Sequence, residues 1–90
     1  MKGKNAEAEK LFERAIKIDE NNPDAFANLG NLFLIQHKFE RAIELLLKAY
    51  ILDPSNENVL LNLIDSYKAQ NNAERVEFYR SKLAFVKAKK

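Results

Sequence analysis

The chain has 90 residues, a formal net charge of +2 and no cysteine, which excludes disulfide-stapled and cysteine-ligated zinc folds. Hydrophobic residues make up 47% and charged residues 31% of it, with two glycines and two prolines. This is too apolar for a disordered chain and too poor in turn residues for a many-stranded β-sandwich. No apolar run approaches the roughly 20 residues of a membrane span and no apolar signal segment opens the sequence, so we expect a helical, cytoplasmic protein.

The first predicted element is a helix over residues 6–18, where apolar residues recur every three or four positions. The break after it contains Asn22, which suits a helix N-cap, and Pro23, which suits the first turn of the next helix. We expect one apolar stripe on this first helix, formed by Ala8, Leu11, Phe12, Ala15 and Ile18.

Four further helices follow in chain order, and short loops join them. The second long break contains Pro54, and Asn56 is the N-cap that we predict after it. Helices joined by such short loops are antiparallel neighbours. The predicted helices cover residues 24–36, 39–52, 57–70 and 73–88.

The sequence repeats itself at a fixed period of 34 residues, which is the separation between Ala8 and Ala42, and the alignment of the repeats needs no gap. A period of this length is typical of stacked supersecondary units, each of which buries its apolar face against the next. The identical residues in this register are the pairs Ala8 and Ala42, Leu11 and Leu45, Ala15 and Ala49, Asp19 and Asp53, Asn22 and Asn56, Asn28 and Asn62, and Leu29 and Leu63.

Residues 23–56 resemble a repeat of the tetratricopeptide repeat family, whose units are about 34 residues long. Phe26 stands where that family's motif has tryptophan, and Leu29 and Gly30 follow it. Small residues such as Gly30 and Ala42 let two helix backbones approach closely, while large residues fill the space between them. The residues that match structural positions of the motif are Ala8, Phe12, Ala15, Phe26, Leu29, Gly30, Phe33, Ala42, Leu46, Ala49, Pro54, Leu63 and Tyr67.

The resemblance implies an all-α fold in which antiparallel αα-hairpins stack as a short right-handed solenoid of five helices. In the last repeat Ile64 replaces the motif's glycine and Arg80 its large apolar residue, so we expect those two helices to lie farther apart. Because the first unit starts midway through a hairpin, we expect the chain to be a section of a longer solenoid. The single predicted domain, 1–90, divides into a half repeat over 1–22, a full repeat over 23–56 and a degenerate repeat over 57–90.

Residue types that carry catalysis are scarce. His37 is the single histidine and lies in a predicted turn, and no serine has a base at motif spacing. The acidic pairs lie on predicted solvent faces. We therefore expect no enzyme activity, no cofactor and no metal site, and we interpret His37 as a solvated turn residue.

The first helices of successive hairpins line a concave groove in tetratricopeptide proteins, and the resemblance places four asparagines there. Asn28 and Asn62 occupy equivalent positions, so stacking would form a ladder similar to that of the O-linked N-acetylglucosamine transferase superhelix. A primary amide both donates and accepts hydrogen bonds, which suits the backbone of an extended peptide. The alternative is a solvated helix face that tolerates asparagine. The candidate peptide-binding residues are Asn28, Asn31, Leu34, Ile35, Asn58, Leu61, Asn62 and Asp65.

A second binding mode of the family is the carboxylate clamp, in which basic residues hold the acidic C-terminus of a heat-shock chaperone. Asn58 and Asn62 stand where those basic residues belong, and Asp24 and Asp65 would repel a carboxylate. The sequence therefore disfavours a chaperone-tail adaptor.

Self-association is the remaining alternative. Phe78 and Phe85 lie on a different side of the last predicted helix from its inward stripe. The two rings either meet another copy of the chain through an uncapped end or fold back within their own hairpin. We expect a protein or peptide partner, or a homo-oligomer, and no nucleic-acid or membrane partner, because no aromatic or glycine-rich motif accompanies the basic C-terminal residues.

Overall fold

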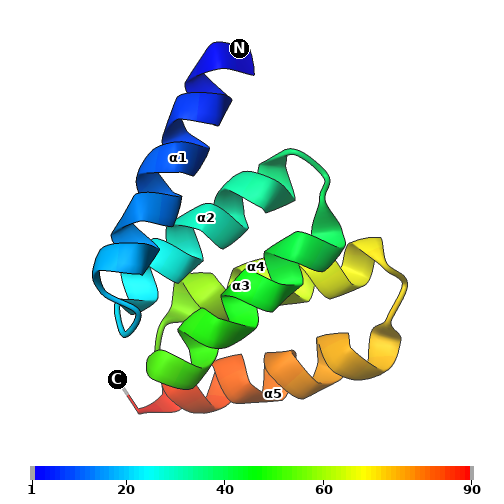
Figure 1. The fold of residues 1–90 in the computed structure, drawn as a ribbon. Helices are drawn as coiled ribbons and strands as arrows, with labels where there is room; N and C mark the ends of the chain where they lie inside the picture. The colour runs from blue at the N-terminus through cyan, green and yellow to red at the C-terminus, as the bar shows by residue number, and fades with distance from the viewer. Residues whose placement is uncertain (1, 90) are drawn as a thin grey trace.

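The computed structural model describes residues 2–89, with side chains from residue 5 onward, and this part of the chain forms five helices within 37 × 27 × 18 Å (Figure 1). The last four begin and end within one residue of their predicted bounds, whereas the first begins earlier than predicted. No strand occurs in the described residues, and the predicted all-α fold is confirmed. The helices are α1 (Lys2–Ile18), α2 (Pro23–Ile35), α3 (Phe39–Leu52), α4 (Glu57–Ala69) and α5 (Ala73–Ala88).

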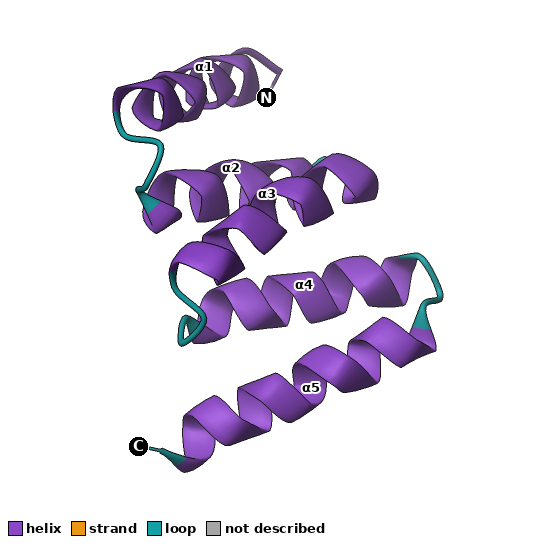
Figure 2. Cartoon of the chain, turned by 60° about the horizontal axis from the view of Figure 1, so that its bottom comes forward, coloured by secondary structure: helices purple, strands orange, loops and turns teal. Residues whose placement is uncertain are grey.

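Each helix packs against the next one along the chain, so the five helices form a stack with α1 and α5 at opposite ends (Figure 2). One further contact joins α2 to α4. The first helices of successive hairpins, α2 and α4, therefore share a surface, which we call the inner face. The surface on the side of α1, α3 and α5 is called the outer face.

The two loops that link one hairpin to the next start the following helix in the same way. Asn22 Oδ1 accepts a hydrogen bond from Asp24 N at 3.0 Å, and Asn56 Oδ1 accepts one from Val59 N at 3.2 Å. Both asparagines are therefore the predicted N-caps, and Pro23 occupies the first turn of α2. These side chains satisfy backbone N–H groups that the helix itself leaves without a partner.

The turns inside the two complete hairpins also match. His37 and Asn71, which hold equivalent positions in successive repeats, have φ angles of 62° and 57°. After each of them the next backbone N–H reaches back five residues: Lys38 N donates to Phe33 O at 2.9 Å, and the equivalent bond at the second turn is 3.0 Å. This left-handed helix end satisfies carbonyl groups of the last turn and reverses the chain.

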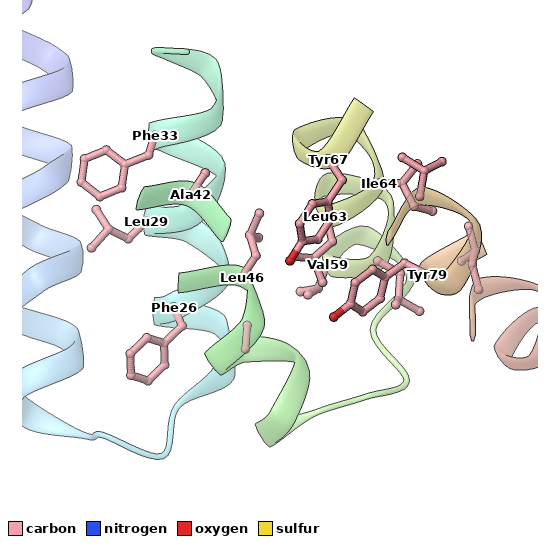
Figure 3. Packing of buried hydrophobic residues seen from close by; sticks show 14 of the residues in the cluster. Phe26, Leu29, Phe33, Ala42, Leu46, Val59, Leu63, Ile64, Tyr67 and Tyr79 are labelled. Atoms are coloured by element: carbon pink, nitrogen blue, oxygen red, sulfur yellow. The ribbon is translucent and has the colours of Figure 1, made fainter. Parts of the chain in front are cut away.

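A continuous apolar core runs through the stack (Figure 3). Phe26, Leu29 and Phe33 point from α2 toward α1, while Leu46 of α3 is fully buried. Pro54 is exposed in its loop. The motif residues found buried, as predicted, are Phe26, Leu29, Gly30, Phe33, Ala42, Leu46, Ala49, Leu63 and Tyr67.

The predicted stripe on α1 is partly wrong. Leu11 and Ile18 are 63% and 83% exposed, and Ile16 packs against the core instead. The reason is that α1 has α2 as its one neighbour among the described helices, whereas α3 lies between α2 and α4. The other residues of the stripe are only half-buried, although their equivalents in α3 are fully buried; they are Ala8, Phe12 and Ala15.

The hairpin of α4 and α5 is more open than that of α2 and α3, as expected from Ile64 and Arg80. The two helices approach each other less extensively, and Arg80 is exposed in a surface ion pair. Aromatic rings fill the space beside them. Tyr79 stacks on Tyr67 with ring centroids 5.7 Å apart and meets Tyr50 edge to face at the same distance.

Candidate functional site

The inner face contains a hollow of about 500 Å³ between α2 and α4. These two helices are in direct contact, and residues from the N-terminal half of each one line the hollow. Side chains with amide groups dominate its walls. The lining residues are Asp24, Ala27, Asn28, Asn31, Asn56, Asn58, Val59 and Asn62.

Helix geometry explains why the four predicted asparagines meet. Asn28 and Asn31 are one turn apart on α2, and Asn58 and Asn62 are one turn apart on α4. Residues at such spacing share a helix face, and the α2–α4 contact sets the two faces beside each other. Asn28 and Asn62 therefore hold equivalent places in two successive repeats.

The four amide groups form no hydrogen bond with another protein group among the described residues. Asn28, Asn31 and Asn58 are exposed and Asn62 is half-buried. A hydrogen bond near Asn62 uses its backbone oxygen, which accepts from Ser66 Oγ at 2.8 Å. Each side-chain amide thus keeps both its donors and its acceptor for a ligand.

Asp24 is the one charged residue in the lining of this hollow, as far as the described side chains go. No lysine or arginine of the described chain lines it. A carboxylate in the hollow would meet a like charge and no cation, which is unfavourable. The chemistry of the hollow suits neutral hydrogen-bonding groups, such as peptide units.

The remaining predicted site residues lie outside the hollow. Ile35 and Leu61 are exposed apolar side chains on the same two helices, and Asp65 is exposed one turn after Leu61. Leu34 is half-buried and packs against the core. The structure therefore brings together the asparagines, but not the apolar residues predicted to accompany them.

Sequence reasoning missed two lining residues, Asn56 and Val59. Asn56 was assigned only a capping role, and its Oδ1 does cap α4, but its position at the start of that helix also exposes it to the hollow. The sequence did contain a signal for these two residues. They lie at the start of the helix that carries Asn58 and Asn62, and residues of a first helical turn point to all sides of the helix. The cap uses Oδ1 of Asn56, and no hydrogen bond of its Nδ2 group to another described residue occurs, so this group is a further donor.

His37, the other residue singled out by type, lies in the turn between α2 and α3 with its ring edge to face against Phe39 at 5.6 Å. Within the described residues, no group of three or more histidine, cysteine or acidic side chains is arranged to hold a metal ion. None of the described helices combines the length and apolar character needed to cross a membrane.

Family comparisons agree with this architecture. A family model described as a TPR repeat matches residues 2–36, and a model described as a tetratricopeptide repeat matches residues 23–56. The chain belongs to the tetratricopeptide repeat family. The matched residues cover α1, α2 and α3, and the repeats of this family indicate a protein-interaction module.

Two curated relatives contain a segment similar to this tetratricopeptide chain. The peroxisomal targeting signal receptor of Candida albicans is 41% identical over 62 residues, which is 69% of this chain and 10% of the receptor. Protein O-mannosyl-transferase TMTC3 of Homo sapiens is 30% identical over 67 residues, which is 74% of this chain and 7% of the relative. The chain thus spans a tenth or less of the length of these relatives.

Proposed function

We propose that this tetratricopeptide chain is a non-enzymatic interaction module that binds an extended peptide of a partner protein along its inner face. The observation that carries the proposal is the group of four asparagine amides around one hollow, all without a hydrogen bond to another described residue. The proposal includes a cytoplasmic location, which the absence of cysteine fits.

Asparagine amides suit this task because an extended peptide presents N–H and C=O groups at every residue. The equivalent positions of Asn28 and Asn62 would let successive repeats contact successive parts of one strand. Contacts of this kind depend on the peptide backbone rather than on its sequence. Selectivity would come from apolar peptide side chains that meet Leu34, Ile35 and Leu61 beyond the hollow.

The relatives support the recognition of a peptide segment. One of them is by name a receptor for a targeting signal. The chaperone-tail adaptor remains the less favoured version of this function, because the hollow offers an aspartate where a terminal carboxylate would need a cation.

The test uses peptides selected on the purified chain from a displayed random library and then synthesised with blocked ends. Changing both Asn28 and Asn62 to alanine should weaken their binding about tenfold by calorimetry, because the lost groups are replaced by no other donor or acceptor. Alanine is the better helix former, so the double variant should unfold at the same or a higher temperature. A loss of affinity could then not be attributed to unfolding.

Asn22→Ala is the matched control, because it removes an asparagine amide that caps α2 and does not line the hollow. It should lower the unfolding temperature and leave the affinity unchanged below that temperature. Equal affinity of the Asn28→Ala, Asn62→Ala variant and the parent chain would refute the amide ladder. The same peptides are also synthesised with a free C-terminus, and binding of that form alone would instead favour the chaperone-tail adaptor.

A second candidate function is self-association as a structural segment of a longer solenoid. The exposure of Leu11 and Ile18 on α1 favours it, because these side chains lack the cover that a neighbouring helix supplies. Light scattering after size exclusion tests it directly. A dimer that dissociates in a Leu11→Ser, Ile18→Ser variant would support this function, and a monomer at high micromolar concentration would reject it.

A further inference from the structure

The outer face carries a pair of hollows, one in each gap between the second helices of neighbouring hairpins, and a third hollow of about 280 Å³ adjoins the first of them. The first lies between α1 and α3 and has a volume of about 450 Å³; Ile16, Lys48 and Ile51 are among its walls. The second lies between α3 and α5 and has a volume of about 530 Å³. Neither hollow shares a lining residue with the asparagine hollow of the inner face.

The two outer hollows are the same feature repeated. Moving the lining of the first hollow forward by one repeat gives the lining of the second at almost every position. The matching pairs are Ile16 and Tyr50, Glu20 and Pro54, Asn21 and Ser55, Lys48 and Lys82, Ile51 and Phe85, and Leu52 and Val86.

Each hollow is bordered by a large apolar side chain that solvent reaches freely. Ile51 is 75% exposed and Phe85 is 61% exposed. Phe85 and Phe78 have therefore not folded back into their hairpin, which was one of the two outcomes expected from the sequence. Exposed apolar residues that gather around a recess are typical of interaction sites.

A further repeat stacked on the chain would not cover the exposed apolar residue that borders each hollow. Ile51 stays exposed even though α3 has helices on both sides, and Phe85 is its equivalent on α5. The apolar border thus belongs to the outer surface of the solenoid and is not an open end of it. Its occupant has to approach from outside the stack.

The charges around the hollows are mostly positive. Lys48 and Lys82 occupy equivalent walls, and Lys89 borders the second hollow with its Nζ 4.5 Å from the centroid of the Phe85 ring. Glu20 is the one acidic residue among the described side chains that line them. An anionic ligand is therefore favoured at the second hollow, where Lys82 and Lys89 face no acidic lining residue, whereas Lys48 and Glu20 balance each other at the first.

We propose that the outer face binds an acidic segment of another protein whose two large apolar side chains occupy the two hollows. Carboxylates of that segment would pair with Lys48 and Lys82, which stand one repeat apart. The recessed shape of the hollows favours such a segment over the flat surface of a membrane. This site is independent of the peptide proposed for the inner face.

The test uses synthetic peptides with blocked ends, in which two leucines or phenylalanines are set at varied spacings among glutamate, serine and glycine. A matched set replaces every glutamate with lysine, and a third set replaces both apolar residues with serine. We expect binding of the acidic apolar set alone, with shifts of the backbone amide resonances of Ser55, Phe85 and Val86 in the labelled chain. Binding of the lysine set with similar affinity, or of none of the sets, would overturn the proposal.

Variants then locate the site. Lys48→Glu with Lys82→Glu, and separately Phe85→Ser, should each weaken the acidic peptides about tenfold. Lys68→Glu is the matched control, since it changes an exposed lysine elsewhere, and it should have no effect. These residues are exposed, so the variants should keep the helical circular dichroism of the parent chain.

Three further results separate this site from its alternatives. Asn28→Ala with Asn62→Ala should leave the acidic peptides bound, so that failure of the inner-face proposal does not affect this one. A dimer that the Phe85→Ser variant abolishes would overturn the proposal in favour of a second copy as the occupant. Binding to vesicles of anionic lipid that the acidic apolar peptides do not compete away would overturn it in favour of a membrane surface.

Discussion

Gly30 of α2 lies directly against Leu46 of α3: a Cβ atom at residue 30 would stand 2.8 Å from Leu46 Cγ and 3.3 Å from Ala42 O. The helices α2 and α3 therefore lie too close together at this point for any residue larger than glycine to fit without a shift of its neighbours. At the equivalent positions of the last repeat, isoleucine replaces this glycine and an exposed arginine replaces the leucine. Both partners of the contact have changed together, and that hairpin is the more open one.

Gly30→Ala should destabilise the chain, although alanine is the better helix former. The added methyl group overpacks against Leu46, which is fully buried, at a cost of about 1–3 kcal/mol. The gain in helix propensity is about 1 kcal/mol. We expect a lower free energy of unfolding by about 1 kcal/mol in urea titrations followed by circular dichroism.

Ala84→Gly in α5 supplies the reference for this experiment, because residue 84 is exposed and reports helix propensity alone. It should cost about 1 kcal/mol. If Gly30→Ala proved more stable than the parent chain by the same amount, the close contact with Leu46 would not constrain the hairpin.

His37→Gly should stabilise the chain by about 1 kcal/mol, because His37 adopts a left-handed conformation that glycine adopts without steric cost. Asn71→Gly, the same change at the equivalent turn, should gain less, since asparagine tolerates this region better than other residues. Thermal unfolding of both variants measures the difference. Equal shifts at the two turns would contradict the argument.

Lys38→Asn should stabilise α3. Lys38 is the N-cap of α3 and has no side-chain hydrogen bond there, whereas Asn72, its equivalent, accepts a hydrogen bond from Arg75 N at 3.1 Å. Installing the same cap should add about 1 kcal/mol to the free energy of unfolding. The reverse change, Asn72→Ala, should remove about as much from α5, and an unchanged unfolding midpoint in either variant would show that these caps contribute little.

The stability of the chain should fall at alkaline pH through Tyr79. Burial raises the pKa of this phenol above its ordinary value of 10.0, the neighbouring Tyr67 adds to the rise, and Arg75 opposes it. The folded chain therefore holds the Tyr79 proton more firmly than the unfolded chain does. This contribution to stability is complete below pH 10.0 and is lost as the pH rises through the pKa of the folded state.

Tyr79→Phe isolates the effect, because phenylalanine keeps the ring and removes the ionisable group. Between neutral pH and about pH 11 the parent chain should lose more free energy of unfolding than the variant does. Parallel losses in the two chains would show that Tyr79 does not carry the dependence.

The sequence was sufficient for the fold because its signals are local and occur twice. The caps Asn22 and Asn56 are the same residue one repeat apart, and the turns at His37 and Asn71 recur at the same period although their residues differ. The stripe on α1 failed for a different reason. The spacing of apolar residues indicates which face of a helix can be buried. Whether Leu11 and Ile18 are in fact buried depends on a neighbouring helix, and the spacing within α1 does not reveal whether one is present.

The grouping of Asn28 and Asn62 in one hollow could be predicted from the period, since equivalent positions in stacked repeats face the same way. Their role in binding remains a proposal. The outer hollows could not be predicted, because each depends on the sizes of side chains from several helices. Tyr79 of α5 packs against Tyr50 of α3, whereas the equivalent position in α3 has the smaller Leu45.

The helix order has a consequence for motion. Nearly all tertiary contacts join helices adjacent in the sequence, so opening one end of the stack breaks contacts with one neighbour only. Amide hydrogens of α1 should exchange fastest, those of α2 and α3 slowest, and those of α5 at a rate between them. A partner that clamps α1 onto α2 would thus slow exchange at one end of the chain before it changed any other region.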